Sequence, residues 1–106
     1  MNVQFKKGVL ELCVLSMLAQ GDRYGYDLAS NLSQSIDISD GTIYPILRRL
    51  KEEGYVTTYL QEASGGPPRK YYALTESGTR EQQKLESEWY EFVGCVNVIL
   101  KEGVCS

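Results

Sequence analysis

Apolar residues recur along this chain at two spacings, one typical of helices and one typical of strands. Residues 8–20 have apolar side chains on almost every side of a helix, which predicts a buried helix that ends at Gly21. A turn at residues 22–26 follows. Apolar residues four apart within residues 24–32 then predict a second helix on which one side is buried.

A third helix is predicted from an apolar stripe on one side and polar residues on the other. The stripe has spacings of 3, 4 and 7 and consists of Ile43, Ile46, Leu47 and Leu50. Pro45 lacks a backbone N–H and is tolerated in a first helical turn, which places the start near Thr42. Ser39 and Asp40 are competing N-cap residues that would start the helix earlier. Gly54 is expected to end it.

Two strands joined by a turn are predicted next. Residues 55–61 alternate β-branched and aromatic side chains, and residues 69–74 form the returning strand. Residues 62–68 between them have the composition of a turn. Helix, turn, helix and hairpin in this order describe a winged helix-turn-helix, an α+β fold that is mainly α. Because this architecture holds one helix in a DNA major groove, we expect residues 1–75 to be a DNA-binding domain.

The last predicted helix spans residues 76–100, is capped by Thr75 and has an apolar stripe of its own. The stripe consists of Leu85, Trp89, Phe92, Val93, Val96, Ile99 and Leu100. Few elements of the domain remain to cover this stripe, so a second copy of the chain is its expected cover. Residues 76–106 are therefore predicted to dimerise. The expected contacts are Leu85, Trp89, Phe92, Val96, Ile99 and Leu100.

Polar residues of the third helix suit DNA recognition, in which side chains reach base edges and phosphates. Thr42 and Tyr44 can reach bases, and Arg48 and Arg49 can bind phosphates or guanine. A solvated amphipathic helix is the plain alternative, but the basic hairpin that follows favours DNA. The glycines of the hairpin tip allow close approach of the backbone. The expected DNA-binding residues are Lys6, Lys7, Ser39, Thr42, Tyr44, Arg48, Arg49, Gly65, Gly66, Arg69 and Lys70.

Charge is distributed unevenly along the chain. The net charge is −3, which by itself does not favour a nucleic-acid partner. However, residues 1–74 carry equal numbers of acidic and basic residues, so the whole acidic excess lies in the tail. Local basic clusters rather than the overall charge set a phosphate-binding surface. The near-neutral first part keeps one alternative open, a winged helix that binds a partner protein without DNA specificity.

Composition argues against an enzyme and against a metal site. The chain has no His and three widely spaced cysteines, Cys13, Cys95 and Cys105. The commonest general base and the usual nitrogen ligand of zinc are therefore absent, and no disulfide framework is expected. We expect no catalytic residue, no metal and no cofactor. No stretch reaches the roughly 18 apolar residues that span a bilayer, and a cytoplasmic protein is expected.

Three motifs carry a resemblance to a known family. They are Gly25-Tyr26-Asp27-Leu28, the stretch Asp40-Gly41-Thr42-Ile43-Tyr44-Pro45-Ile46-Leu47-Arg48-Arg49-Leu50, and the stretch Gly65-Gly66-Pro67-Pro68-Arg69-Lys70-Tyr71-Tyr72-Ala73-Leu74-Thr75. In these motifs the chain resembles the PadR family of bacterial transcriptional regulators. Its single long last helix is similar to that of the short subfamily, which includes multidrug-binding repressors.

The resemblance implies a homodimeric repressor on double-stranded DNA with a pseudo-palindromic operator. It also implies that a planar aromatic effector, often cationic, binds between two copies of Trp89 at the dimer centre. Phe92, Val93 and Glu86 are the expected neighbours of such an effector, and a carboxylate of Glu86 or Glu88 would favour a cation. Packing in the dimer interface is the plain alternative for Trp89.

Overall fold

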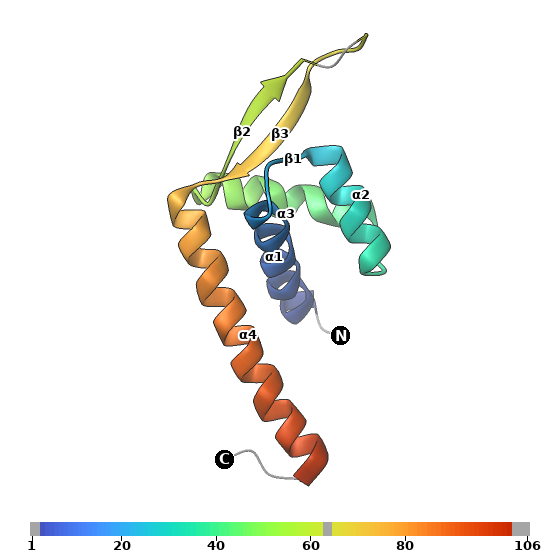
Figure 1. Ribbon diagram of the computed structural model, residues 1–106. Helices are drawn as coiled ribbons and strands as arrows, with labels where there is room; N and C mark the ends of the chain where they lie inside the picture. Colours follow the sequence, from blue (N-terminus) through green and yellow to red (C-terminus); the bar gives the residue numbers. More distant parts are fainter. Residues whose placement is uncertain (1–2, 63–64, 103–106) are drawn as a thin grey trace.

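The computed structural model describes residues 3–62 and 65–102 and contains four helices and three strands within them. The elements are α1 (Val3–Ala19), β1 (Arg23–Tyr24), α2 (Gly25–Ser35), α3 (Asp40–Glu52), β2 (Val56–Gln61), β3 (Arg69–Leu74) and α4 (Glu76–Glu102). The β2–β3 hairpin projects away from the helices on one side, and α4 extends in the other direction (Figure 1). None of the described helices is long and apolar enough to cross a membrane.

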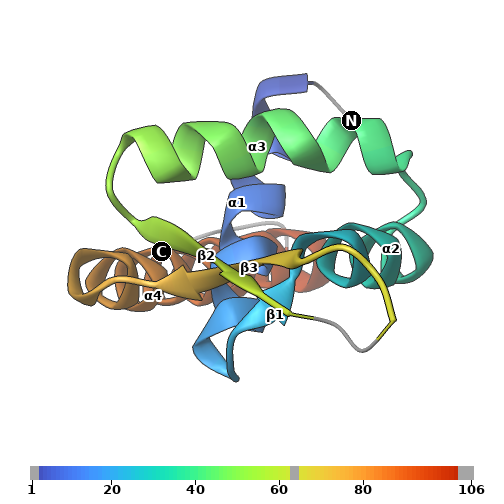
Figure 2. The same cartoon turned by 90° about the horizontal axis from the view of Figure 1, so that it is seen from above.

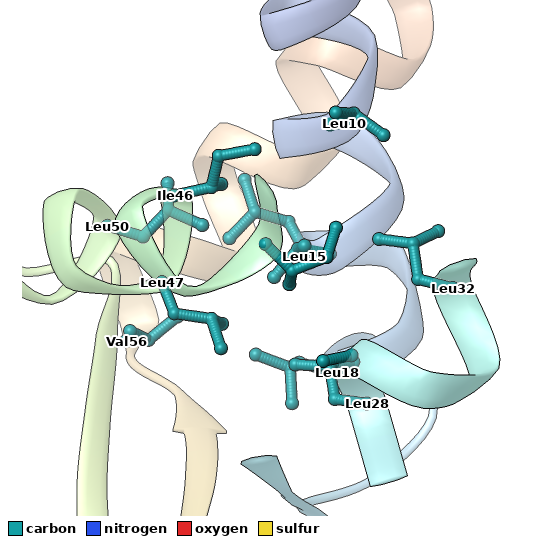
Figure 3. Packing of buried hydrophobic residues seen from close by; sticks show 12 residues of the cluster. Leu10, Leu15, Leu18, Leu28, Leu32, Ile46, Leu47, Leu50 and Val56 are labelled. Carbon is teal, nitrogen blue, oxygen red and sulfur yellow. The ribbon is translucent and has the colours of Figure 1, made fainter. Parts of the chain in front are cut away.

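One apolar cluster holds α1, α2 and α3 together. Side chains from the three helices meet in its centre, with Val56 of β2 at its edge (Figure 3). The buried members are Leu10, Val14, Leu15, Leu18, Leu28, Ala29, Leu32, Ile43, Ile46, Leu47, Leu50 and Val56. The predicted apolar stripe of the third helix is thus buried as a whole. Seen from above, α1 packs between α3 and α4 (Figure 2).

Two helix starts differ from the sequence prediction. The first helix begins at Val3 rather than Gly8. The third begins at Asp40 with Ser39 as its N-cap, so the start near Thr42 was wrong and the competing N-cap was right. A tight bond from the Thr42 N–H to the Ser39 carbonyl, at 3.0 Å, closes the first turn. Pro45 consequently lies inside the helix and not in its first turn.

A third strand, β1, was not predicted. Tyr24 was assigned to the second helix, but it pairs with Tyr71 in an antiparallel sheet of order β1-β3-β2. The chain turns directly from β1 into α2, because Gly25 has no side chain at that point. A Cβ on Gly25 would lie 2.8 Å from the ring of Tyr72, so a larger residue would displace that ring. The wing is therefore a three-stranded sheet joined to α2.

The base of the wing is tied to the start of α4 by hydrogen bonds. Thr75 Oγ1 accepts a bond from the Gly78 N–H at 3.0 Å, which confirms the predicted cap. The same hydroxyl donates to the Gly54 carbonyl at 2.6 Å, and the Thr75 N–H donates to the Tyr55 carbonyl at 3.1 Å. At Gly78 the start of α4 comes so near the chain before β2 that an added Cβ would overlap the Tyr55 carbonyl oxygen.

Side chains also join α4 to α1. Gln82 is nearly buried, and its Nε2 donates to Ser16 Oγ at 3.2 Å and to Glu86 Oε2 at 2.8 Å. Leu85 packs against the apolar cluster from the same side. The first part of α4 is therefore fixed to the helical core, while its later turns extend beyond it (Figure 1).

Candidate nucleic-acid interface

The exposed side of α3 carries most of the residues predicted to read DNA. Thr42, Tyr44 and Arg48 are exposed, while the apolar stripe faces the cluster. Ser39 lies at the start of this side, with its hydroxyl 3.1 Å from that of Thr42. Tyr44 and Arg48 are four residues apart and therefore stand one turn apart on the same side. Thr42 and Tyr44 are two residues apart and so lie about 200° apart around the helix, which places the hydroxyls of Ser39 and Thr42 on one flank of the buried stripe and Tyr44 with Arg48 on the other.

Arg49 has different surroundings from its neighbour Arg48. Its guanidinium forms an ion pair with the carboxylate of Glu11 on α1. Its side chain is 40% exposed and that of Glu11 only 14%. The structure therefore separates two arginines that were predicted as a pair of phosphate ligands. Arg48 faces outward, and Arg49 reaches back to α1.

Tyr44 lies near the point at which α3 meets the wing. Burial raises the pKa of the Tyr72 hydroxyl above its ordinary value, and the nearby Tyr44 raises it further. Tyr72 belongs to β3, and its ring also covers Gly25 at the start of α2. Through Tyr72, the exposed surface of α3, the wing and the start of α2 are therefore neighbours.

The wing carries its two predicted basic residues at the start of β3. Arg69 and Lys70 are exposed and pair with Gln61 and Leu60 across the hairpin. Because successive side chains of a strand point to opposite faces, the two cations belong to different faces of the sheet. The Arg69 guanidinium lies 4.9 Å from the centre of the Tyr24 ring, which is within the range of a cation–π contact.

A row of stacked tyrosines crosses the sheet on the Arg69 face. The ring of Tyr71 lies 6.0 Å from that of Tyr24 and 5.7 Å from that of Tyr59. The Tyr59 hydroxyl donates to Asp22 Oδ2 at 2.8 Å, and this hydrogen bond raises the pKa of Tyr59. Sequence reasoning missed this row because it depends on β1, a strand of two residues with no periodicity of its own.

The hairpin tip and the N-terminal lysines complete the predicted DNA-binding set. Gly65 has φ +76°, a conformation that favours glycine, and Gly66 is exposed. Lys6 and Lys7 lie within α1, but their side chains are outside the described part of the chain.

An apolar groove lies between α1 and α4. Its cavity has a volume of about 270 Å³ and is lined by Gly8, Val9, Leu12, Leu85, Glu88, Trp89 and Phe92. Trp89 and Phe92, two residues of the expected effector site, both line this groove. The carboxylate in this groove belongs to Glu88, whereas the predicted Glu86 accepts the hydrogen bond from Gln82. Predicted Val93 is not among the lining residues.

Glu88 was the alternative to Glu86 in the expected effector site. It stands three residues after Leu85 and four before Phe92, a spacing that places the three side chains on one side of a helix. Next to the groove is a second hollow of about 420 Å³, lined by Glu88, Glu91, Phe92 and Cys95.

The apolar stripe of α4 continues past the groove into open solvent. Phe92 is 51% exposed, Ile99 49% and Leu100 78%. Val93 and Val96 are half-buried, whereas Leu85 packs on the core. Large apolar side chains in a row on one projecting helix are typical of an association surface.

Comparison with known proteins places this geometry in a family. The sequence profile described as "Transcriptional regulator PadR-like family" matches residues 14–84. The chain is 35% identical over 108 residues to "Transcriptional regulator YqjI" of Escherichia coli and 34% identical over 77 residues to "Negative transcriptional regulator PadR" of Bacillus subtilis. The matches cover 92% and 69% of this chain. They span only 50% and 42% of those two proteins.

A solved structure matches over nearly its whole length. A PadR-like transcriptional regulator from Bacillus cereus superimposes with a TM-score of 0.82 at 36% identity. The match covers 92% of this chain and 96% of that one. The winged helix-turn-helix with a three-stranded wing and a long last helix is therefore a known arrangement.

Proposed function

Because this chain belongs to the PadR-like family of transcriptional regulators, we propose that it is a homodimeric repressor that binds a pseudo-palindromic operator. We further propose that a small aromatic effector releases it. The chain is accordingly a DNA-binding regulator and not an enzyme. The observation that carries the proposal is the exposure of Thr42, Tyr44 and Arg48 on α3, directly beside a wing with two cations.

In the proposed complex, α3 enters the major groove with its first turns toward the bases. Thr42 and Tyr44 contact base edges or a thymine methyl, and Arg48 binds a phosphate. Arg69 and Lys70 belong to different faces of the wing, so they serve different parts of the DNA backbone. Lys6 and Lys7 add phosphate contacts that carry no sequence information.

Replacing Tyr44 with Ala tests this placement. We expect affinity for an operator duplex, selected from random sequence by the wild-type protein, to fall by about 10- to 100-fold, since one good base contact discriminates by about 1–3 kcal/mol. Affinity for a non-operator duplex should change little. Tyr26→Ala, which removes another exposed tyrosine outside α3, is the matched control. Equal operator affinity of the Tyr44→Ala protein and the wild type would disprove this assignment of α3.

Association through α4 is the second part of the proposal. Phe92, Ile99 and Leu100 are large apolar side chains with about half or more of their surface exposed on α4, and a two-fold axis brings two such surfaces together. Residues 1–75 then serve DNA binding and residues 76–106 serve dimerisation. Leu85 belongs to the proposed dimerisation segment and also packs on the helical core of the DNA-binding domain.

The effector site is proposed in the groove between α1 and α4. Trp89 and Phe92 offer flat apolar surfaces, and Glu88 supplies a negative charge at the same place. An aromatic cation satisfies both, through stacking and through charge attraction. In the proposed dimer, the two grooves open toward the two-fold axis, so that one effector is held between the two Trp89 side chains.

Trp89 is the sole tryptophan, so its fluorescence reports on this groove directly. Titration with a planar cationic dye such as ethidium should quench the emission and saturate at one dye per dimer. Glu88→Gln should weaken dye binding by up to roughly 5-fold, because an exposed ion pair contributes about 0.2–1 kcal/mol. Glu86→Gln is the matched control and should leave dye affinity unchanged. A dimer whose Trp89 emission does not respond would leave Trp89 as an interface residue only.

A further inference from the structure

The ion pair between Glu11 and Arg49 is the charged contact that links α1 to α3 among the described residues. Its two members are 38 positions apart in the sequence. Glu11 is largely covered, and Nε of Arg49 is buried without a hydrogen-bond partner among the described atoms. The inner part of this guanidinium is thus shielded from water while the rest of the side chain stays partly exposed, and the carboxylate of Glu11 offsets the loss of hydration.

Arg48 and Arg49 are adjacent arginines in different surroundings, so each serves as a control for the other. Arg48 is exposed on the side of α3 that carries Tyr44. Arg49 is held by α1 and cannot bind a phosphate at full strength while Glu11 occupies it. An arginine fixed at both ends of its side chain also restrains the rotation of its helix about its own axis.

We propose that Glu11 is a positioning residue for operator binding. Through Arg49 it sets the rotation of α3 against α1 and withholds one cation from the DNA backbone. The inference rests on the proposed role of α3 as the recognition helix. Specificity benefits twice from this arrangement, because the exposed side chains of Thr42, Tyr44 and Arg48 keep a fixed orientation toward the bases and sequence-independent attraction is kept low.

The salt dependence of DNA binding tests the inference. Each phosphate contact adds about −0.9 to the slope of log affinity against log salt concentration. We expect Arg48→Gln to flatten this slope by about one contact. Arg49→Gln should leave the slope unchanged and lower operator affinity by roughly 10-fold, through misplacement of α3. If Arg49→Gln flattens the slope as Arg48→Gln does, Arg49 is a phosphate ligand and the inference is wrong.

Glu11→Gln removes the carboxylate and keeps Arg49, so it leaves the Arg49 cation available to a DNA phosphate. The slope should steepen by up to one contact, and the ratio of operator to non-operator affinity should fall by roughly 10-fold. An unchanged slope and ratio in Glu11→Gln would also overturn the inference. This measurement uses the full chain and the same two duplexes as the Tyr44 experiment.

A charge exchange separates positioning from general loss of stability. Glu11→Arg and Arg49→Glu should each lose discrimination, and the double variant should recover it to within roughly 3-fold, because coupling of this kind is specific to contacting residues. Circular dichroism identifies the temperature range in which each variant is folded. If the exchanged variants do not fold, the two Gln variants still decide the matter through their slopes. A wild-type chain with no salt-dependent DNA binding would instead contradict the proposed function itself.

Discussion

Replacing Phe92 with Glu is expected to convert the dimer to monomers and to weaken operator binding by more than about 100-fold. The exposed Phe92 ring lies near the middle of the α4 stripe, and the proposed partner covers it. A carboxylate there would be buried against apolar side chains, which is costly without a paired cation. Two linked half-site contacts exceed one contact in affinity by about 10²–10⁴, and a monomer loses that gain. Sedimentation velocity and operator titration measure the two effects.

Tyr90→Glu is the matched control for Phe92→Glu. Tyr90 is also a large exposed aromatic residue of α4, at 65% exposure, but it lies outside the apolar stripe. This variant should remain a dimer with near wild-type operator affinity. A Phe92→Glu protein that sediments as a dimer would contradict the α4 interface, whatever its affinity for DNA.

Replacing Gly78 with Ala is expected to have the largest effect on stability. The added Cβ would overlap the Tyr55 carbonyl oxygen, a backbone atom that cannot rotate away. Either the first turn of α4 or the end of α3 must move, and the hydrogen bonds of Thr75 at this junction would be lost. Overpacking of this kind costs about 3 kcal/mol or more. In a domain of this size that lowers Tm by about 15 °C.

Gly94→Ala provides the control on the same helix. No described atom lies within 4 Å of a Cβ at Gly94, and alanine favours a helix over glycine by about 0.5–1 kcal/mol. We expect the Tm of this variant to rise by a few degrees, measured by circular dichroism at matched protein concentration. If Gly78→Ala has the same Tm as the wild type, the close approach of α4 to residue 55 is not a property of the folded chain.

Local patterns were enough to predict most of the fold. The stripe of α3, the alternation in the wing and the Thr75 cap each depend on residues close together in the sequence, and each was confirmed. The strand β1 depends on pairing with Tyr71, which lies far away in the chain, so no local pattern could indicate it. The start of α3 was misjudged because the known preference of proline for a first turn outweighed the N-cap signal of Ser39.

Some residues of the candidate site could likewise be predicted from local sequence, and others could not. Exposure of Thr42, Tyr44 and Arg48 follows from the helical spacing of the apolar residues between them. The position of Arg49 does not, because its partner Glu11 belongs to another helix and the long side chain of arginine reaches across the helix surface. In α4, the sequence predicted an acidic residue near Trp89, and only the packing of α4 against α1 assigned Glu88 to the groove.

Because α4 is long, a small change in its tilt at the proposed dimer interface produces a large displacement of the DNA-binding domains. Between Thr75, which is bonded to the base of the wing, and Phe92 at the interface, the helix covers roughly 25 Å. A change of about 8° in the tilt of α4 at the interface would therefore move each DNA-binding domain by roughly 3.5 Å, which is close to one base-pair step. The operator half-site spacing that the proposed dimer prefers would then depend on this tilt. Changes in the packing of α4 should alter which operator spacing is preferred before they alter which bases are read.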